Sequence, residues 1–521
     1  MLPQLLELSD IPRLALTERE LVDAIFTARP WALDQSKPKH WPDNAAVVLV
    51  TKGLARLLQD QEFLEQLLRH LRPNKKSKFS LLSVVVDGIP HEGHCDIPGT
   101  QVAQTVLRDS KYLLSSEGIA VLSGRLDSIL PGLWDPAEAP PAVHHGDADN
   151  AQPALEFLVP SVAKRKPLRV TVPVANTLFT NGRPHTMCAT EYEWKGQDGE
   201  EPVLKQTRLV ERARQVVVPS TFGGWRYKNR FPQTRVPLLP LTPARKVVSG
   251  LGNILRQVEI NGTPMPASKE LEELIPKIMD YRTHIYGIEK AGVSVGVWAV
   301  IIPEKVMAKR AGLAPFLGEP RRAHMTPPIW LPEARAVFEW RYSQHCSQKL
   351  SIAPLLEAGC QVRKVLSGGG GWGEKQGLLS LDPQTRYSTP DQEDVEKFIL
   401  AFKGEGGTAS GITPGSWIQF VYEPLGGPLE LAKPVSMARL PTYDPGNNRI
   451  IVGTRSTHSS SDSPSQVTVH EGAFGATASQ GLYVAAKGIA TKLDTANSYL
   501  SWGKATRGRE DKGTDDIDPE Y

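Results

Sequence analysis

Two continuous apolar runs flank an amphipathic segment in the N-terminal part of the chain. The runs are Ala45–Val50 and Leu81–Val86, and such runs are typical of strands that are buried on both faces of a sheet. Between them, Gln61–Leu71 places its phenylalanine and its leucines at helical spacing. This order predicts a strand–helix–strand unit with two parallel strands.

Apolar and alternating segments predict further elements along the chain. The expected strands are 118–123, 168–174, 214–218, two short strands within 246–260, 293–302, 361–366, 416–422 and 450–454. The expected helices are 11–28, 269–280 interrupted by Pro276, 334–350, 351–359 and 391–402. The mixture predicts an α/β or α+β fold, with mixed sheets flanked by helices.

The chain is expected to form two domains, because 521 residues are too many for one ordinary core. Residues 1–304 are the first α/β domain, in which 135–153 has the composition of a disordered insertion. A proline-rich link is expected over 305–335, followed by a second α/β domain over 336–502. The charged segment 503–521 lacks a core-forming pattern and is expected to be a disordered tail.

The composition is that of an ordinary globular protein, with 40% hydrophobic and 22% charged residues and a net charge of +3. This small charge does not by itself indicate a nucleic-acid partner. The four cysteines are widely spaced, which favours a reducing compartment. The start of the chain has no basic signal region, and no apolar run is long enough to span a membrane. We therefore expect an intracellular protein, cytoplasmic rather than mitochondrial.

A glycine-rich run is the strongest candidate for a site. Residues 367–377 contain six glycines, one tryptophan and one lysine. Such a density is typical of a flexible linker or of backbone that closely approaches something, and the tryptophan argues against a linker. The alternative is a purely structural loop whose glycines let the tryptophan tuck in. The candidate ligand-binding residues are Gly368, Gly369, Gly370, Gly371, Trp372, Gly373 and Lys375.

The run departs from the phosphate loop of nucleotide-binding proteins. Gly368 and Gly373 have the glycine spacing of that loop, but glutamate precedes Lys375 and glutamine stands where a serine or threonine should hold magnesium. Consecutive glycine amides can still converge on an anion, with Arg363 or Lys364 nearby. We therefore expect a non-catalytic binding or sensory protein for a small anionic ligand, with 367–377 as its site.

A basic and aromatic stretch, Gly223–Phe231, supports a second hypothesis. If the stretch is extended, its aromatic rings and its cations lie on opposite faces. Rings that stack bases and cations that neutralise phosphates would suit an RNA-associated factor. The other interpretation is a half-buried strand with a solvated basic face. The candidate nucleic-acid contacts are Trp225, Arg226, Tyr227, Lys228 and Arg230.

The third hypothesis is an enzyme of unknown reaction. Asp87, His91 and His94 follow a predicted strand, which places them on a loop at the carboxyl edge of the sheet, where α/β proteins bind ligands. Cys95 comes next, but the sequence offers no second pair of ligands at zinc spacing, so no metal is expected. Neither Gly-x-Ser-x-Gly nor His-Glu-x-x-His is present. Catalytic residues and cofactors stay unassigned.

Two stretches give the chain a resemblance to a known family. One is the strand–helix–strand unit followed by Glu117–Leu122. The other is Val247–Ala267, in which a glycine, an asparagine, a strand and an Asn-Gly turn lead to an acidic helix. Over residues 45–275 these resemble the FIST-type sensory domain, which implies an α/β module for ligand sensing and assigns no functional residue. Val172–Gly182 and the glycine-rich run look similar to stretches of uncharacterised fungal proteins, which implies no mechanism.

Overall fold

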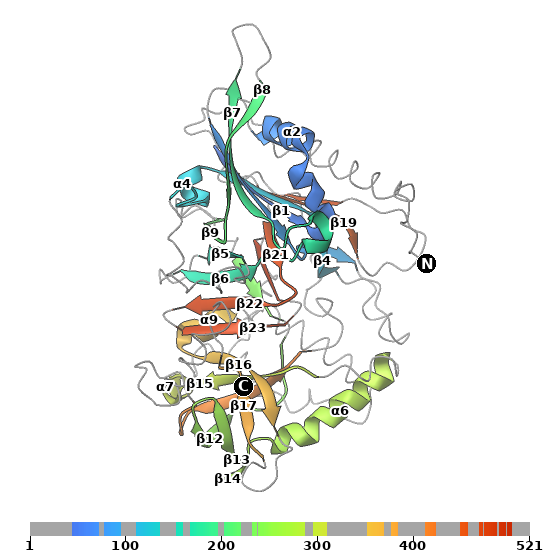
Figure 1. The fold of residues 1–521 in the computed structure, drawn as a ribbon. Coiled ribbons are helices and arrows are strands. Elements are labelled where there is room, and N and C mark those ends of the chain that lie inside the picture. Colours follow the sequence, from blue (N-terminus) through green and yellow to red (C-terminus); the bar gives the residue numbers. More distant parts are fainter. Residues whose placement is uncertain are drawn as a thin grey trace, which may run out of the picture.

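The structure is a computed structural model, and most of its described residues are in strands (Figure 1). It describes residues 44–71, 78–94, 111–135, 153–159, 167–195, 203–219, 232–236, 238–286, 295–309, 352–368, 377–383, 412–423, 449–456, 468–471, 474–486, 489–495 and 498–502. Among these, no helix is long and apolar enough to cross a membrane.

The first sheet combines strands from both ends of the chain. In spatial order they are β20 (Thr468–Glu471), β19 (Arg449–Ser456), β4 (Lys111–Gly124), β1 (Ala45–Thr51), β2 (Phe79–Val86), β7 (Met187–Lys195) and β8 (Val203–Glu211), and β3 (Ile89–His94) pairs with β4 outside this order. β1 and β2 are parallel, with Ala45 opposite Ser80, which confirms the predicted unit. The other pairs in this sheet are antiparallel.

Different layers cover the two faces of the first sheet. Successive residues of a strand point to opposite sides. In β1, Val48 and Val50 therefore pack under the 3-10 helix η3 (Lys52–Gln59) and the helix α2 (Gln61–Leu71). Val47 and Leu49 belong instead to the core on the other side. All four valine and leucine side chains are fully buried, which explains why this strand is apolar throughout.

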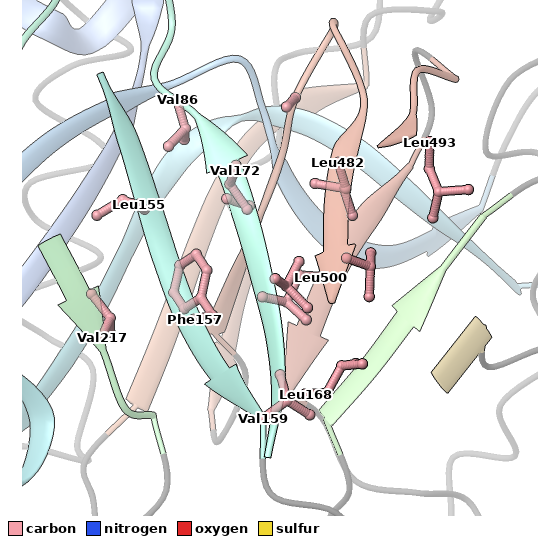
Figure 2. Packing of buried hydrophobic residues seen from close by; sticks show 14 of the residues in the cluster. Val86, Leu155, Phe157, Val159, Leu168, Val172, Val217, Leu482, Leu493 and Leu500 are labelled. Atoms are coloured by element: carbon pink, nitrogen blue, oxygen red, sulfur yellow. The ribbon is translucent and has the colours of Figure 1, made fainter. Parts of the chain in front are cut away.

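A second sheet forms the layer on that other side. Its strands, in spatial order, are β23 (Ile489–Leu493), β22 (Leu482–Ala486), β6 (Leu168–Pro173), β5 (Ala154–Val159) and β9 (Arg214–Val217). Figure 2 shows Phe157 of β5, Val172 of β6 and Leu482 of β22 in one shared interior. A small third sheet of β10 (Pro232–Arg235), β24 (Tyr499–Trp502) and β21 (Phe474–Thr477) joins the same core.

A closed ring of six strands forms the lower part of the molecule in Figure 1. Around the ring are β18 (Trp417–Tyr422), β12 (Arg245–Leu251), β13 (Ile254–Ile260), β17 (Leu379–Leu381), β16 (Gln361–Gly368) and β15 (Val297–Ile302), which pairs back with β18. β11 (Leu239–Pro240) pairs with β18, and β14 (Thr263–Pro266) with β13. Val247, Leu255, Ala299 and Phe420 share one buried cluster, so this barrel has a packed core.

Five helices complete the described elements. They are α4 (Leu126–Ile129), α5 (Leu178–Asn181), α6 (Lys269–Tyr286), α7 (Glu304–Lys309) and α9 (Ile352–Ala358). α6 packs Leu271 against the barrel core, and Pro276 does not end it. α9 ends before Gly359, whose φ of 107° favours glycine, so the predicted helix end is confirmed.

The predicted mixture of strands and helices is thus present, but strands dominate and the closed barrel was not predicted. The sheets also do not follow the predicted division at 305–335. The barrel combines β12, β13 and β15 from the first part with β16, β17 and β18 from the second. Strand pairing joins segments that are distant in sequence, and this pairing cannot be inferred from the local composition of the chain. The predicted insertion 135–153 lies almost entirely, and the predicted tail 503–521 entirely, outside the described residues.

Candidate functional site

The glycine-rich run connects two neighbouring antiparallel strands of the barrel. β16 ends at Gly368, and β17 begins at Leu379, just after Gly377. Gly368 lies opposite Leu379 across the pair. The run is therefore the loop of a β-hairpin, and its two ends are fixed by barrel strands. We call Gly368, Gly377, Leu378 and Leu379 the hairpin base.

Packing explains the two glycines of the hairpin base. A Cβ added to Gly368 would lie 2.1 Å from Leu379 Cδ2 and 3.1 Å from the carbonyl oxygen of Leu378. A Cβ added to Gly377 would lie 2.5 Å from Pro266 Cβ, and the φ of Gly377 is +80°. Side chains at these positions would clash, and Gly377 also has a backbone conformation that other residues adopt at a cost.

The end of the loop is also tied to α6. The carbonyl of Gly377 accepts a hydrogen bond of 3.2 Å from the backbone N–H of Ser268, the residue before the helix. The Ser268 hydroxyl donates to Glu272 Oε1 at 2.6 Å, and Ser268 is buried. Gly377 therefore has a fixed place between β14, α6 and β17. The remaining candidate residues, Gly369, Gly370, Gly371, Trp372, Gly373 and Lys375, lie outside the described residues.

Lys364, which was expected near the ligand, takes part in a junction between the barrel and β23. Its ammonium lies 2.8 Å from Asp494 Oδ2 and 5.4 Å from the centre of the Trp298 ring. The Trp298 indole donates to the other oxygen of Asp494 at 3.2 Å. A second ion pair, from Lys492 to Asp382 at 3.5 Å, joins the same two elements. Lys364 thus has an internal role in the structure.

Arg363 is also engaged inside the protein. It lies opposite Ala299 in the barrel and is 5% exposed. Its Nε and Nη2 donate to Gln361 Oε1 at 3.3 and 3.1 Å. Burial lowers the pKa of Arg363, and the nearby Asp382 opposes that change. Both cations therefore have acceptors within the barrel and its junction, and their expected place near the ligand stays a prediction.

The carboxyl edge of β1 and β2 brings together a second set of polar groups. Asp87 follows β2, and its Oδ1 lies 2.6 Å from the ammonium of Lys52, which follows β1. Its Oδ2 accepts hydrogen bonds of 2.8 Å from both the backbone N–H and the hydroxyl of Ser479. Burial raises the pKa of Asp87, but the bonds with Lys52 and Ser479 outweigh burial and leave the pKa below its ordinary value.

These contacts bear on the residues that the enzyme hypothesis named, Asp87, His91 and His94. Both carboxylate oxygens of Asp87 already have partners within the chain. His91 and His94 lie on the strand β3, which pairs with β4, and not on the loop that the sequence predicted. Cys95 lies outside the described residues. The part of the chain that the structure describes contains no group of three or more His, Cys, Asp or Glu residues that could hold a metal ion.

The pattern of the sequence identified Asp87 but missed its partners. Lys52 and Ser479 come from distant segments, and Ser479 is separated from Asp87 by 392 residues. The available signal was the turn at 477–481, where small residues separate two short apolar runs. The basic and aromatic residues Trp225–Arg230 lie outside the described residues, so the nucleic-acid hypothesis stays a prediction.

Comparisons of the chain with protein-family models, with curated proteins and with solved structures found no match.

Proposed function

We propose that the protein is a non-catalytic binding or sensory protein, and that it holds a small anionic ligand at the glycine-rich hairpin. The observation that carries the proposal is the hairpin base. Packing accounts for Gly368 and Gly377. The proposal assigns the ligand to the other four glycines of the run, which lie outside the described residues. Their backbone N–H groups suit an anion, and Lys375 adds a positive charge.

The surroundings of the hairpin base favour binding by the backbone over chemistry by side chains. The atoms nearest to a Cβ added at either base glycine belong to Leu379, Leu378 and Pro266, which carry no ionisable group. Two cysteines elsewhere in the chain are also poorly suited to catalysis. Burial raises the pKa of the Cys360 thiol to about 12, and burial also raises the pKa of the Cys188 thiol. These two thiols are therefore protonated at neutral pH and poor nucleophiles.

Small-ligand sensing is also the activity that the resemblance of 45–275 to the FIST-type sensory domain implies, and we include it in the proposal. The first test is native mass spectrometry of the purified chain, followed by the same sample after denaturation. A mass excess that disappears on denaturation is expected, and its size identifies the class of ligand. An excess that matches a metal ion would contradict the proposal.

The second test removes the charge that the loop offers. Lys375→Ala is expected to weaken the binding of pyrophosphate by about tenfold to a hundredfold in a calorimetric titration, because a hydrogen bond to a charged group contributes about 1.5–3 kcal/mol. The unfolding temperature should not change. Lys205→Ala, on the exposed strand β8, is the matched control and should bind as the unmodified protein does. Equal affinity for pyrophosphate in the Lys375→Ala and Lys205→Ala variants would overturn the proposed site.

A further inference from the structure

A row of side chains crosses four neighbouring strands of the barrel, β12, β13, β17 and β16. Leu251 lies opposite Ile254, and Ile254 lies opposite Ser380 on its other side. Ser380 lies opposite Ser367, and Leu366 directly precedes Ser367 at the place where the register of this pairing shifts. The two ends of the row are open to solvent, since Leu251 is 63% exposed and Leu366 is 55% exposed.

The row lies on the outer face of the barrel. Leu255 and Leu379, which neighbour Ile254 and Ser380 along their strands, belong to the buried core of the barrel. Successive residues of a strand point to opposite sides, so Ile254 and Ser380 point outward. Residues that lie opposite one another share a face, so the rest of the row points outward as well. The row therefore presents three large apolar side chains, with serines between them.

The chain segment 384–411 begins and ends beside this row. Before it, the N–H of Leu381 donates to the carbonyl of Asn253 at 2.9 Å, and the Asn253 side chain donates to the carbonyl of Leu381 at 2.9 Å. After it, the N–H of Ile412 donates to the carbonyl of Gly252 at 2.8 Å. Gly252 and Asn253 are the turn that joins β12 to β13. Both ends of the segment are therefore held at one turn, next to the row.

The sequence of this segment offers an apolar surface of matching size. Residues 384–411 lie outside the described residues. Within them, 391–402 is predicted to be a helix, and its large apolar residues at helical spacing are Val395, Phe398, Ile399 and Phe402. A helix of this length is roughly 18 Å long. The row spans three intervals between strands, which is roughly 14 Å. The residues on either side of 391–402 can each reach roughly 20 Å when extended, so they can connect such a helix to the turn.

We propose that 391–402 docks as an amphipathic helix across the row, with its apolar face on Leu251, Ile254 and Leu366. A helix this short is marginally stable in water by itself, and packing of its apolar face supplies most of its stability in a protein. The two fixed ends keep the segment close to the row, which raises its effective concentration there. A second copy of the chain is less well supported, because a stable protein interface covers about 800 Å² per partner, far more than three side chains.

Hydrogen exchange of the full chain, measured by mass spectrometry of its peptides, tests the proposal. Peptides from 391–402 are expected to exchange at least about tenfold more slowly than an unprotected chain. Leu251→Ser, Leu366→Ser and Phe398→Ser should each accelerate this exchange about tenfold, because burial of one such side chain contributes on that order. Leu209→Ser is the matched control. Leu209 is 51% exposed on β8, outside the barrel, so the exchange of 391–402 should not change.

Unprotected exchange of 391–402 in the unmodified protein would overturn the proposal, as would equal exchange of this segment in Leu251→Ser and Leu209→Ser. Peptides from β1 and β2 should exchange slowly in every variant, which verifies that the fold is intact. Two other occupants of the row give distinct results. Protection that depends on protein concentration would mean that a second copy covers the row. Acceleration by Leu366→Ser in 369–376 alone would mean that the glycine-rich run covers it. Either result would show that the docking proposal is wrong.

Discussion

The carboxyl edge of β1 and β2 and the glycine-rich hairpin both have the residue types of a ligand site, but the structure uses them differently. At the edge, a cation, a carboxylate and a hydroxyl from three parts of the chain bind one another, with Asp87 between Lys52 and Ser479. At the hairpin base, the side chains of Leu379 and Pro266 occupy the space where the two glycines lack a Cβ, and the carbonyl of Gly377 accepts a hydrogen bond from Ser268. Polar side chains at a sheet edge are therefore weak evidence for a site when they satisfy each other.

The comparison also separates two roles of glycine. At Gly377 the absence of a side chain is a packing requirement, because Pro266 occupies the space where a Cβ would lie. The glycines between Gly368 and Gly377 lie outside the described residues, and the proposed function assigns them to an anion. If this distinction is right, substitutions at the base will change stability, and substitutions within the loop will change binding.

The largest expected effect is that of Gly377→Ala on stability. The substitution places a side chain at a φ of +80° and 2.5 Å from Pro266 Cβ. A left-handed conformation costs about 1–2 kcal/mol for a residue with a Cβ, and overpacking costs about 1–3 kcal/mol. We therefore expect the free energy of unfolding to fall by about 2–5 kcal/mol, measured by chemical denaturation.

Gly370→Ala is the matched control within the same run. Its free energy of unfolding should stay within about 0.5 kcal/mol of that of the unmodified protein, as is usual away from packed positions. Its affinity for pyrophosphate should fall. A large loss of stability in Gly370→Ala would mean that the whole run is a packing feature, and the distinction between base and loop would be lost.

Asp87→Ala is expected to have the next largest effect. The substitution removes the acceptor for Ser479 and the partner of Lys52. Lys52 is about half exposed, so its ion pair contributes little, and most of the loss comes from the two bonds with Ser479. We expect the free energy of unfolding to fall by about 1–2 kcal/mol.

A double-mutant cycle checks that assignment. Ser479→Ala alone removes only the hydroxyl bond, so it should cost less than Asp87→Ala. The cost of the double substitution should be smaller than the sum of the two single costs, because they disrupt one contact. Additive costs would show that Asp87 and Ser479 do not act together. The carboxyl edge of β1 and β2 would then no longer be an example of polar side chains that satisfy one another.

The local parts of the fold could be predicted from the sequence. The two apolar runs and the amphipathic segment between them are β1, α2 and β2, since hydrophobic periodicity reports directly which faces are buried. The barrel could not be predicted, because its closure depends on pairing between β15 and β18, which are far apart in the chain. No strand was predicted after residue 454, where β21 reads Phe-Gly-Ala-Thr and has no strong alternation.

The candidate sites show the same limit. The place of Asp87 at the end of β2 follows from the pattern, but the side chains that neutralise it come from elsewhere in the chain. Arg363 and Lys364 could be identified as cations near the glycine-rich run, but not as partners of Gln361 and Asp494. Sequence reports the residue types that are available, and only the packing shows which of them are already engaged.

The smallest expected effect is a change in how stability depends on pH. The pKa of Asp87 is below its ordinary value in the folded protein. An aspartate with a lowered pKa stabilises the folded state fully above its unfolded pKa of about 3.9, and this stabilisation is lost as the pH falls towards the folded pKa. Asp87→Asn has no such charge to lose. It should therefore lose less stability than the unmodified protein between about pH 5 and pH 3.

Chemical denaturation of both proteins across this pH range measures the effect. The side-chain amide of the Asp87→Asn variant keeps an acceptor for Ser479, so at about pH 7 the deficit of the variant should be below about 1 kcal/mol, and the deficit should shrink on acidification. A deficit that stays constant or grows would show that the charge of Asp87 does not hold the edge together. Lys52 and Asp87 would then be available for a ligand, and the edge would replace the glycine-rich hairpin as the stronger candidate site.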